Sequence, residues 1–408
     1  MSIHPMEFRY GTEEMKAIWE EDFRLRCLFR VEAALARAEE ELGMIPQGAA
    51  AEIARAAEIT PPQRAKEIED EIGHDMMATV LAFSREQPSF GEWIHLGRPP
   101  RYPGYCYRPA DQGLPGYPGG EAERAALLLL DLAMKNKDLV CAGRTHGQIA
   151  VPTTYGLRFA IWASEVGRHI QRLGELRPRA AVGKCPGAGT QAAYGQFGMD
   201  IQERVMRHLD LFRRWMYPIR LCRGPACRND LLDGSCCLHL DKIFIEMRTL
   251  QRTEIAEVEE GFGKKQVGSS TMPHKRNPIK SEQICGLARV VRAQLIPAFE
   301  NIPWDERDLT NSSCERVVFP EAFIFTDHIL TLAARTLASM HLRPDNIERN
   351  LMLLRGLNMA ENVMVELARR GVGRQQAHEI MRQSSMIAFE ERKDLKDVLL
   401  ENESVRDA

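Results

Sequence analysis

The chain has 408 residues, of which 44% are hydrophobic, and its net charge at pH 7 is −3. This is the composition of a folded protein of one to three domains, and it has no basic block of the kind that binds nucleic acid or a membrane surface. The longest apolar run, Ala125 to Leu130, is far too short to span a bilayer, and charged residues from Glu7 onward come too early for a signal peptide, so we expect a cytoplasmic protein.

Helical periodicity dominates the chain. Apolar residues recur at helical spacing over 15–42, 154–173 and 281–295. Gly43 ends the first of these helices, and Pro320 is expected to open a further one. Strand alternation is almost absent, so we predict an all-α fold. Its long helices should form a bundle, and apolar stripes too wide for one neighbour to cover indicate packing between subunits.

Two stretches, 98–120 and 220–239, break this pattern. Both are rich in Pro, Gly, Arg and Cys, and neither shows helical periodicity although each lies between strong helices. We hypothesise that both are out-of-frame translations of an ordinary gene. Resequencing the gene tests this idea, because an intact reading frame through both stretches would contradict it. The second stretch contains four cysteines, Cys222, Cys227, Cys236 and Cys237. Their spacing is not that of a usual zinc site, so no metal site is predicted.

The segment Gly268–Pro278, GSSTMPHKRNP, is the most informative of the chain. Gly268 allows unusual backbone angles, and Pro273 and Pro278 exclude a regular helix or strand through the segment. A mobile loop that carries serine, lysine and asparagine side chains can close over an anionic substrate and exclude water. Taken alone, a stretch of this kind is more often a basic surface loop, and its role in catalysis is what the family resemblance given below implies.

Five other segments contain polar residues suited to chemistry. They are Arg9–Tyr10, His74–Asp75, His95, Arg144–Gln148, and the run from Glu306 to Arg316. Taken singly, each has a plain structural interpretation: a histidine at a helix start or in a cap, a buried histidine with a partner, or a solvated arginine. Their significance depends on the combination.

Together these segments resemble the adenylosuccinate lyases, a branch of the fumarase/aspartase superfamily, from about Phe8 to Val398. The strings RTHGQIAVPTTYG, EMRTLQRTEIAEVEE, GSSTMPHKRNP and ERDLTNSSCERVVFPEAF carry the resemblance. It implies three helical domains: 1–97, a central bundle 98–340 that carries the loop, and a shortened 341–408. It also implies a homotetramer whose active sites each draw on three subunits. The implied reaction is β-elimination of fumarate from a succinyl nucleotide of purine synthesis, with no metal or organic cofactor.

The resemblance also assigns roles residue by residue. Ser269 resembles the general base, which must act as an alkoxide stabilised by N–H groups and positive charge, and His146 resembles the general acid. His95 supports the site, and Arg9, Tyr10 and the arginines after residue 306 match contacts to the nucleotide phosphate. The substrate-binding positions are Arg9, Tyr10, His74, Asp75, Thr145, Ser270, Lys275, Arg276, Asn277, Arg307, Ser312 and Arg316.

The chain departs from the family at several points, and this leaves alternatives open. Arg98–Pro100 stands where the family has a Thr-Ser-x-Asp segment, and the C-terminal domain usually continues beyond Ala408. One alternative is another lyase of the superfamily, an argininosuccinate lyase or a carboxymuconate cycloisomerase. The phosphate-contact pattern at Arg9–Tyr10 and Arg316 argues against it, since those substrates carry no phosphate. The other is an inactive homologue, disrupted at 98–120 and 220–239, that serves as a structural subunit in a mixed tetramer.

Overall fold

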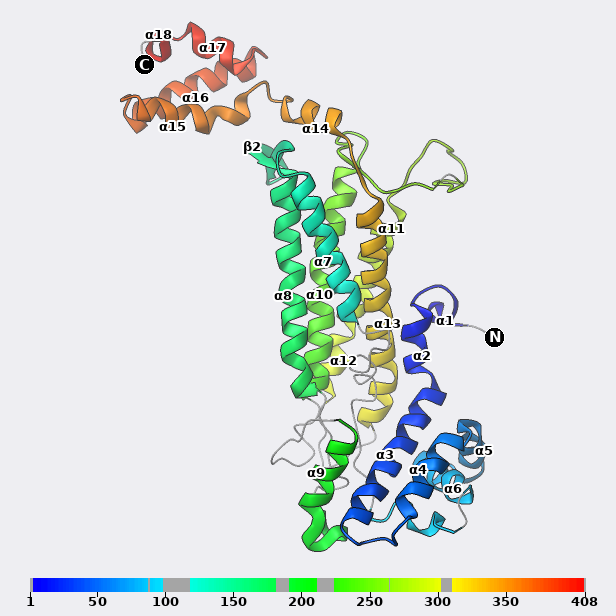
Figure 1. Cartoon of the computed structure of the whole chain (residues 1–408). Helices are drawn as coiled ribbons and strands as arrows, with labels where there is room; N and C mark the ends of the chain where they lie inside the picture. Colours follow the sequence, from blue (N-terminus) through cyan, green and yellow to red (C-terminus); the bar gives the residue numbers. More distant parts are fainter. Residues whose placement is uncertain are drawn as a thin grey trace. The chain divides into compact units, whose positions relative to one another are not determined.

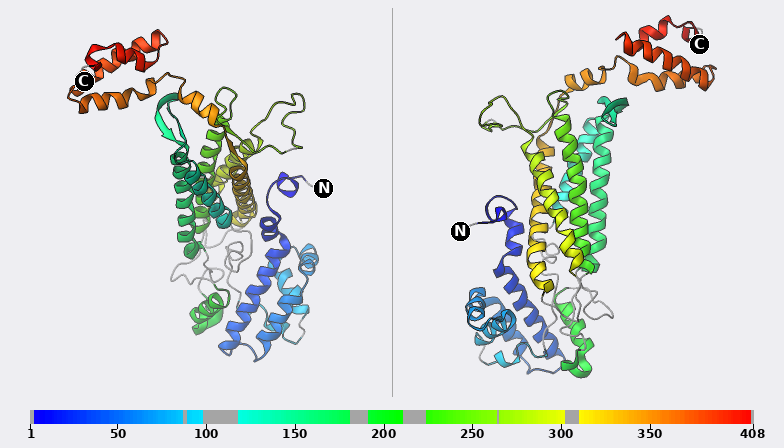
Figure 2. Two further views of the ribbon diagram at one scale, coloured as in Figure 1. Left: turned by 45° about the horizontal axis from the view of Figure 1, so that its top comes forward. Right: turned by 180° about the vertical axis from the view of Figure 1, so that it is seen from behind.

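The structure, a computed structural model, describes residues 3–86, 89–97, 118–180, 191–210, 224–263, 265–301 and 310–406. Helices account for most of these residues, which confirms the predicted all-α class (Figures 1 and 2). The chain divides into two compact units. Unit 1 comprises 1–123, 167–241 and 284–332, and unit 2 comprises 124–166, 242–283 and 333–408. The three-domain boundaries expected from the sequence remain a prediction.

The N-terminal part of unit 1 is a cluster of short helices around one long amphipathic helix, α3 (Figure 1, blue). The rings of Phe29 and Phe83 stack in its core with centroids 5.5 Å apart. The helix predicted over 15–42 is two helices, because the extended backbone at Glu20 interrupts it. The helices are α1 Pro5–Phe8, α2 Glu13–Trp19, α3 Glu21–Glu41, α4 Ala49–Ile59, α5 Pro62–Ile72 and α6 Asp75–Arg85.

Further helices follow in the middle of the chain, and five helices have residues in both units: α7 (Pro118–Lys135), α8, α10, α11 and α13. The helices predicted over 154–173 and 281–295 are confirmed by α8 and α11. Both owe their periodicity to a face that is buried along its length, as Phe159 and Val166 are in α8. The helices are α8 Tyr155–Ala180, α9 Gly198–His208, α10 Gly224–Leu250, α11 Ile279–Ala293, α12 Leu295–Glu300 and α13 Thr310–Ser339.

Helix α13 corrects the prediction at Pro320. The proline lies inside the helix, which already begins at Thr310. An interior proline costs ~3 kcal/mol, and the burial of neighbouring apolar residues such as Phe319 and Phe323 offsets that cost. Residues 312–339 are also long and apolar enough to cross a membrane, but 72% of their most apolar window is buried inside the structure, as in the core helix of a soluble protein.

The segment before α2 packs against α13 within unit 1. The Tyr10 ring lies 5.4 Å from the His328 ring, and Thr12 Oγ1 donates a hydrogen bond of 2.6 Å to Asp327 Oδ2. Gly11 between them has φ +91°, and a Cβ there would lie 2.4 Å from an isoleucine side chain of α13. Only glycine therefore allows this close approach, which places the Arg9–Tyr10 pair beside α13.

Burial, together with the nearby carboxylates of Glu121 and Glu14, raises the pKa of Asp327 to about 6 although its bond with Thr12 lowers it. The folded state therefore binds this proton more tightly than the unfolded chain does. Its free energy of unfolding falls, by up to ~3 kcal/mol, as the pH rises from about 4 to above 6. We expect Asp327→Asn, which has no charge to bury, to raise Tm at pH 8 and to lose this advantage as the pH is lowered to 4. A difference in Tm that does not change with pH would contradict this explanation.

Unit 2 contains the strands of the described structure. Strands β1 and β2 form an antiparallel hairpin with a bulge between Ala142 and Arg144, and β3 pairs antiparallel with β4. The hairpin was not predicted, because its seven-residue second strand, interrupted by Pro152, shows little alternation. Besides the greater part of α7, the elements are β1 Val140–Thr145, β2 Gln148–Thr154, β3 Val258–Glu259, β4 His341–Leu342, α14 Pro344–Leu351, α15 Ala360–Arg369, α16 Arg374–Glu390, α17 Leu395–Glu401 and α18 Glu403–Arg406.

The structure contradicts the expected loss of helix over most of 220–239. Helix α10 begins at Gly224 and runs through this stretch. Pro225 falls in its first turn, where the missing N–H of proline has no helical partner to lose. Farther along, Cys237 and Leu240 are buried at helical spacing. Residues 98–117 and 220–223 lie outside the described residues, and the reading-frame hypothesis stays a prediction.

Candidate active site

The segment from Gly261 to Pro278, here called the signature loop, joins β3 to α11 without regular structure in its described residues. Two of its residues approach closely, since a Cβ at Gly268 would lie 2.1 Å from the carbonyl oxygen of Lys275. The Asn277 side chain donates a hydrogen bond of 2.8 Å to the Gly268 carbonyl across the same gap. The absence of a side chain at 268 and the asparagine amide together define how the loop closes on itself.

Ser269 lies at the start of this closed turn. Its Oγ accepts hydrogen bonds from the backbone N–H groups of Thr271 and Met272, at 3.3 and 3.1 Å. Two amide dipoles thus point at the hydroxyl oxygen. This arrangement favours negative charge on that oxygen, which is what a serine needs in order to act as a base. The side chain is half-buried, whereas Ser270 and Lys275 beside it are exposed.

A shared carboxylate anchors the base of the signature loop. Glu259 on β3 accepts hydrogen bonds from the guanidinium groups of Arg276 and Arg343. Burial raises the pKa of Glu259, but the two arginines outweigh burial and the net shift is downward. The Arg276 guanidinium also lies over the Phe262 ring, 5.3 Å from its centroid. Arg276 and Asn277 were predicted to bind substrate; in the structure their side chains hold the loop together, and substrate binding stays a prediction.

Thr145 and His146 lie at the tip of the β1–β2 hairpin, which leads directly into α8 (Figure 2). Thr145 pairs with Gln148, so that His146 and Gly147 form a two-residue turn with φ +53° and +75°. Positive φ at both central positions is the geometry that suits a tight hairpin, and glycine provides it without strain. The tip, including the His146 imidazole, is exposed.

In unit 1, the start of α6 meets α13. The His74 side chain caps α6 by accepting the Met77 N–H at 3.1 Å. Asp75 accepts a hydrogen bond of 3.0 Å from Arg316 Nη2. Ser312, one turn before Arg316 on α13, is half-buried. Of the predicted substrate-binding residues in this unit, Asp75 and Arg316 are therefore in direct contact, and Arg307 lies outside the described residues.

His95 has a partner that the sequence did not indicate. Its Nδ1 lies 2.8 Å from Oε1 of Glu32, whose side chain is buried on α3. Burial raises the pKa of Glu32, and the histidine opposes that rise. His95 also has φ +67°, an uncommon value for a residue with a side chain. This contact fits the plain structural interpretation, a histidine with a polar partner, and the supporting role of His95 stays a prediction.

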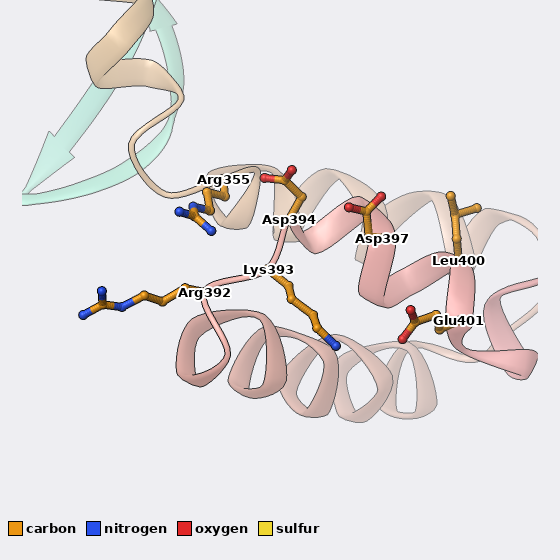
Figure 3. Close-up of a pocket in the computed structure, with 7 residues that line it drawn as sticks. All are labelled: Arg355, Arg392, Lys393, Asp394, Asp397, Leu400 and Glu401. Carbon is orange, nitrogen blue, oxygen red and sulfur yellow. The ribbon is translucent and has the colours of Figure 1, made fainter.

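A metal cluster and a pocket among the C-terminal helices are the other two features that could form a site. Within the described residues no three His, Cys, Asp or Glu side chains come together as a metal site, and six cysteines there have free thiols. A pocket of about 580 Å³ lies among the C-terminal helices (Figure 3). Its charges of opposite sign balance, so it has no preference for an anionic substrate. Its lining residues are Arg355, Arg392, Lys393, Asp394, Asp397, Leu400 and Glu401.

Enzymes of known structure share this fold over nearly the whole chain. The fumarate lyase of Mesorhizobium sp. BNC1 matches 97% of this chain and 91% of its own, with a TM-score of 0.87 and 29% sequence identity. The 3-carboxy-cis,cis-muconate lactonizing enzyme of Pseudomonas putida matches 98% and 91%, with a TM-score of 0.86 and 29% identity. Residues 124–293 match the sequence family described as Lyase. Fold and loop therefore define a lyase of the fumarase/aspartase type.

Closer sequence relatives identify the branch. Residues 356–408 match the family described as Adenylosuccinate lyase C-terminus. The adenylosuccinate lyases of Methanocaldococcus jannaschii and Pyrococcus abyssi are 45% and 46% identical over 99% of this chain, which covers 89% and 91% of their lengths. The chain belongs to the adenylosuccinate lyase family and is a carbon–nitrogen lyase. The identity to these relatives exceeds the 29% found for the muconate enzyme, so a cycloisomerase is not favoured.

Proposed function

We propose that this chain cleaves adenylosuccinate to AMP and fumarate, and that it releases fumarate from the succinyl-carboxamide ribotide of purine biosynthesis by the same reaction. The observation that carries the proposal is the environment of Ser269. Its hydroxyl oxygen accepts two backbone N–H groups inside a loop that also carries Lys275. Membership of the adenylosuccinate lyase family supports the choice of substrate.

The proposed reaction is a β-elimination. Ser269, as an alkoxide, removes a proton from the carbon next to a succinyl carboxylate. The electron pair of that C–H bond forms the double bond of fumarate, the C–N bond breaks, and His146 gives a proton to the departing nitrogen. A proton next to a carboxylate is weakly acidic, so the barrier is dominated by the dianion that forms. Ser270, Lys275 and Asn277 are the residues that we propose to stabilise it.

The phosphate of the nucleotide is proposed to bind residues of unit 1. The Arg9–Tyr10 pair lies beside α13, the helix that also carries Ser312 and Arg316. The Arg316 side chain is 60% exposed and so is accessible to a ligand. Guanidinium groups bind phosphate through paired N–H donors, which suits both arginines to this role. Arg307 is proposed as a further phosphate contact, and His74, Asp75, Thr145 and Arg276 as contacts to the rest of the substrate.

We further propose a cytoplasmic homotetramer whose active sites are each shared by three subunits, with no metal or organic cofactor. Exposed apolar side chains of unit 2 support an interface between subunits. On α7, Leu127, Leu130 and Met134 recur at helical spacing with 66%, 50% and 70% of their surface exposed. Leu157 and Ile161 on α8 are 56% and 50% exposed. Apolar rows of this kind are typical of helices that pack against another subunit.

An absorbance assay with adenylosuccinate tests the proposed function. We expect the purified chain to release AMP and fumarate in equal amounts, with the succinyl-carboxamide ribotide as a second substrate. Argininosuccinate serves as the matched control, because it yields fumarate by the same chemistry but carries no phosphate. Turnover of argininosuccinate without release of AMP from adenylosuccinate would overturn the choice of substrate.

A further inference from the structure

The buried carboxylate of Glu257 joins three separate parts of unit 2. The side chain is fully buried, between the end of α10 and β3. Its two oxygens accept hydrogen bonds of 2.5 Å from Arg144 Nη2, 2.5 Å from the Tyr155 hydroxyl and 2.9 Å from Asn350 Nδ2. Burial raises the pKa of Glu257, but these three donors outweigh burial and lower it. The carboxylate is therefore ionised and its charge is matched by Arg144.

The Glu257 contacts hold both ends of the β1–β2 hairpin. Arg144 is the residue before Thr145 and stands at the bulge that precedes the tip. Tyr155 follows the last residue of β2 and begins α8. One carboxylate thus holds the first strand near its tip and the second strand at its base. The direction in which the intervening turn presents His146 depends on both attachments.

The segment that carries Glu257 is itself held by α14. Asn350 Nδ2 also donates a hydrogen bond of 2.8 Å to the Ile255 carbonyl, and Asn346 Nδ2 donates one of 2.8 Å to the Ala256 carbonyl. The backbone N–H of Arg343 donates to the Glu257 carbonyl at 2.9 Å. Glu257 is therefore a fixed point, whereas the residues of the hairpin tip are exposed.

We propose that Glu257 is a positioning residue for His146, acting through Arg144. The inference rests on the proposed role of His146 as the general acid. Glu257 touches neither substrate nor the reacting atoms. It keeps the hairpin tip in the orientation from which the imidazole reaches the departing nitrogen, and an error of about 1 Å in such an orientation costs about a hundredfold in rate.

The kinetic test compares the same Glu→Gln substitution at two positions of the chain. Glu257→Gln keeps the shape of the side chain but cannot accept from both Arg144 and Tyr155 on separate oxygens. Glu246→Gln is the control, because the Glu246 side chain on α10 is 39% exposed and its Oε1 lies as far as 3.6 Å from Arg158 Nη1. We expect Glu257→Gln to lower kcat about 100-fold with KM changed less than about threefold, and Glu246→Gln to leave both unchanged. Equal kinetics in the two variants would overturn the proposal.

Hydrogen exchange tests the same inference independently of activity. In Glu257→Gln the amides of residues 143–149 should exchange faster, with the rest of the chain unchanged. Exchange that stays as in the wild type, or that rises uniformly along the chain, would show that Glu257 does not position the hairpin. Arg144→Lys keeps the positive charge but loses the planar guanidinium group, and it should give the same local pattern of exchange. It replaces Glu257→Gln in this test if that variant does not fold. A wild-type chain without lyase activity would refute the proposed function while the exchange comparison still decides the positioning role.

Discussion

Replacing Ser269 with alanine is expected to lower kcat for adenylosuccinate by on the order of a hundredfold or more. The Ser269 oxygen is where two backbone N–H groups converge, and alanine leaves those amides with no oxygen to stabilise. Because proton removal occurs only in the transition state, the loss should fall on kcat, with KM changed little. Steady-state kinetics of AMP release measure it.

Ser270→Ala is the natural comparison for Ser269→Ala. Ser270 is exposed and is proposed to bind the substrate carboxylate without taking its proton. Its loss should therefore raise KM more than it lowers kcat. Should Ser269→Ala retain the kcat of the wild type, Ser269 is not the base. If the wild-type chain itself shows no turnover that a substitution could remove, the alternative of an inactive structural subunit gains support.

Replacing His146 with alanine is expected to reduce kcat by a similar factor, again on the order of a hundredfold or more. The departing nitrogen would have to leave without a proton donor, which is costly for an amine. Because His146 and Ser269 act in the same elimination, the double variant should lose much less than the product of the two single losses. Rate measurements on the three variants give this comparison directly. Fully multiplicative losses, or an effect of His146→Ala on KM alone, would contradict the assignment of the general acid.

The sequence predicted the helices best where one face is buried along the whole element. The apolar spacing over 154–173 located α8, although Leu157 and Ile161 of that repeat are exposed and Val166 is buried. It failed at Pro320, where the polar residues from Thr310 to Arg316 hid the first two turns of α13. It also missed the β1–β2 hairpin, whose only local signal is Gly147 after His146.

The candidate site was predictable where it is local in the chain. The prolines of the GSS loop predicted an irregular segment, which the structure confirms, and the structure adds the two amides that converge on Ser269. Its role in catalysis, which the resemblance implies, stays a prediction. Glu257 was not predictable, because it lies among other glutamates that resemble a solvated charged run, and its partner Arg144 is 113 positions away. Burial and pairing over such a distance are properties of the folded chain, and no local pattern reveals them.

The carboxylate of Glu259 is shared by two arginines. It accepts hydrogen bonds from Arg276 of the signature loop and from Arg343, which precedes α14, so a single side chain fastens the signature loop to the beginning of the C-terminal helices. A disturbance in those helices can therefore reach the signature loop through Arg343, Glu259 and Arg276. Disruption of the C-terminal helices would then lower the reaction rate first, while the rest of the chain stayed folded.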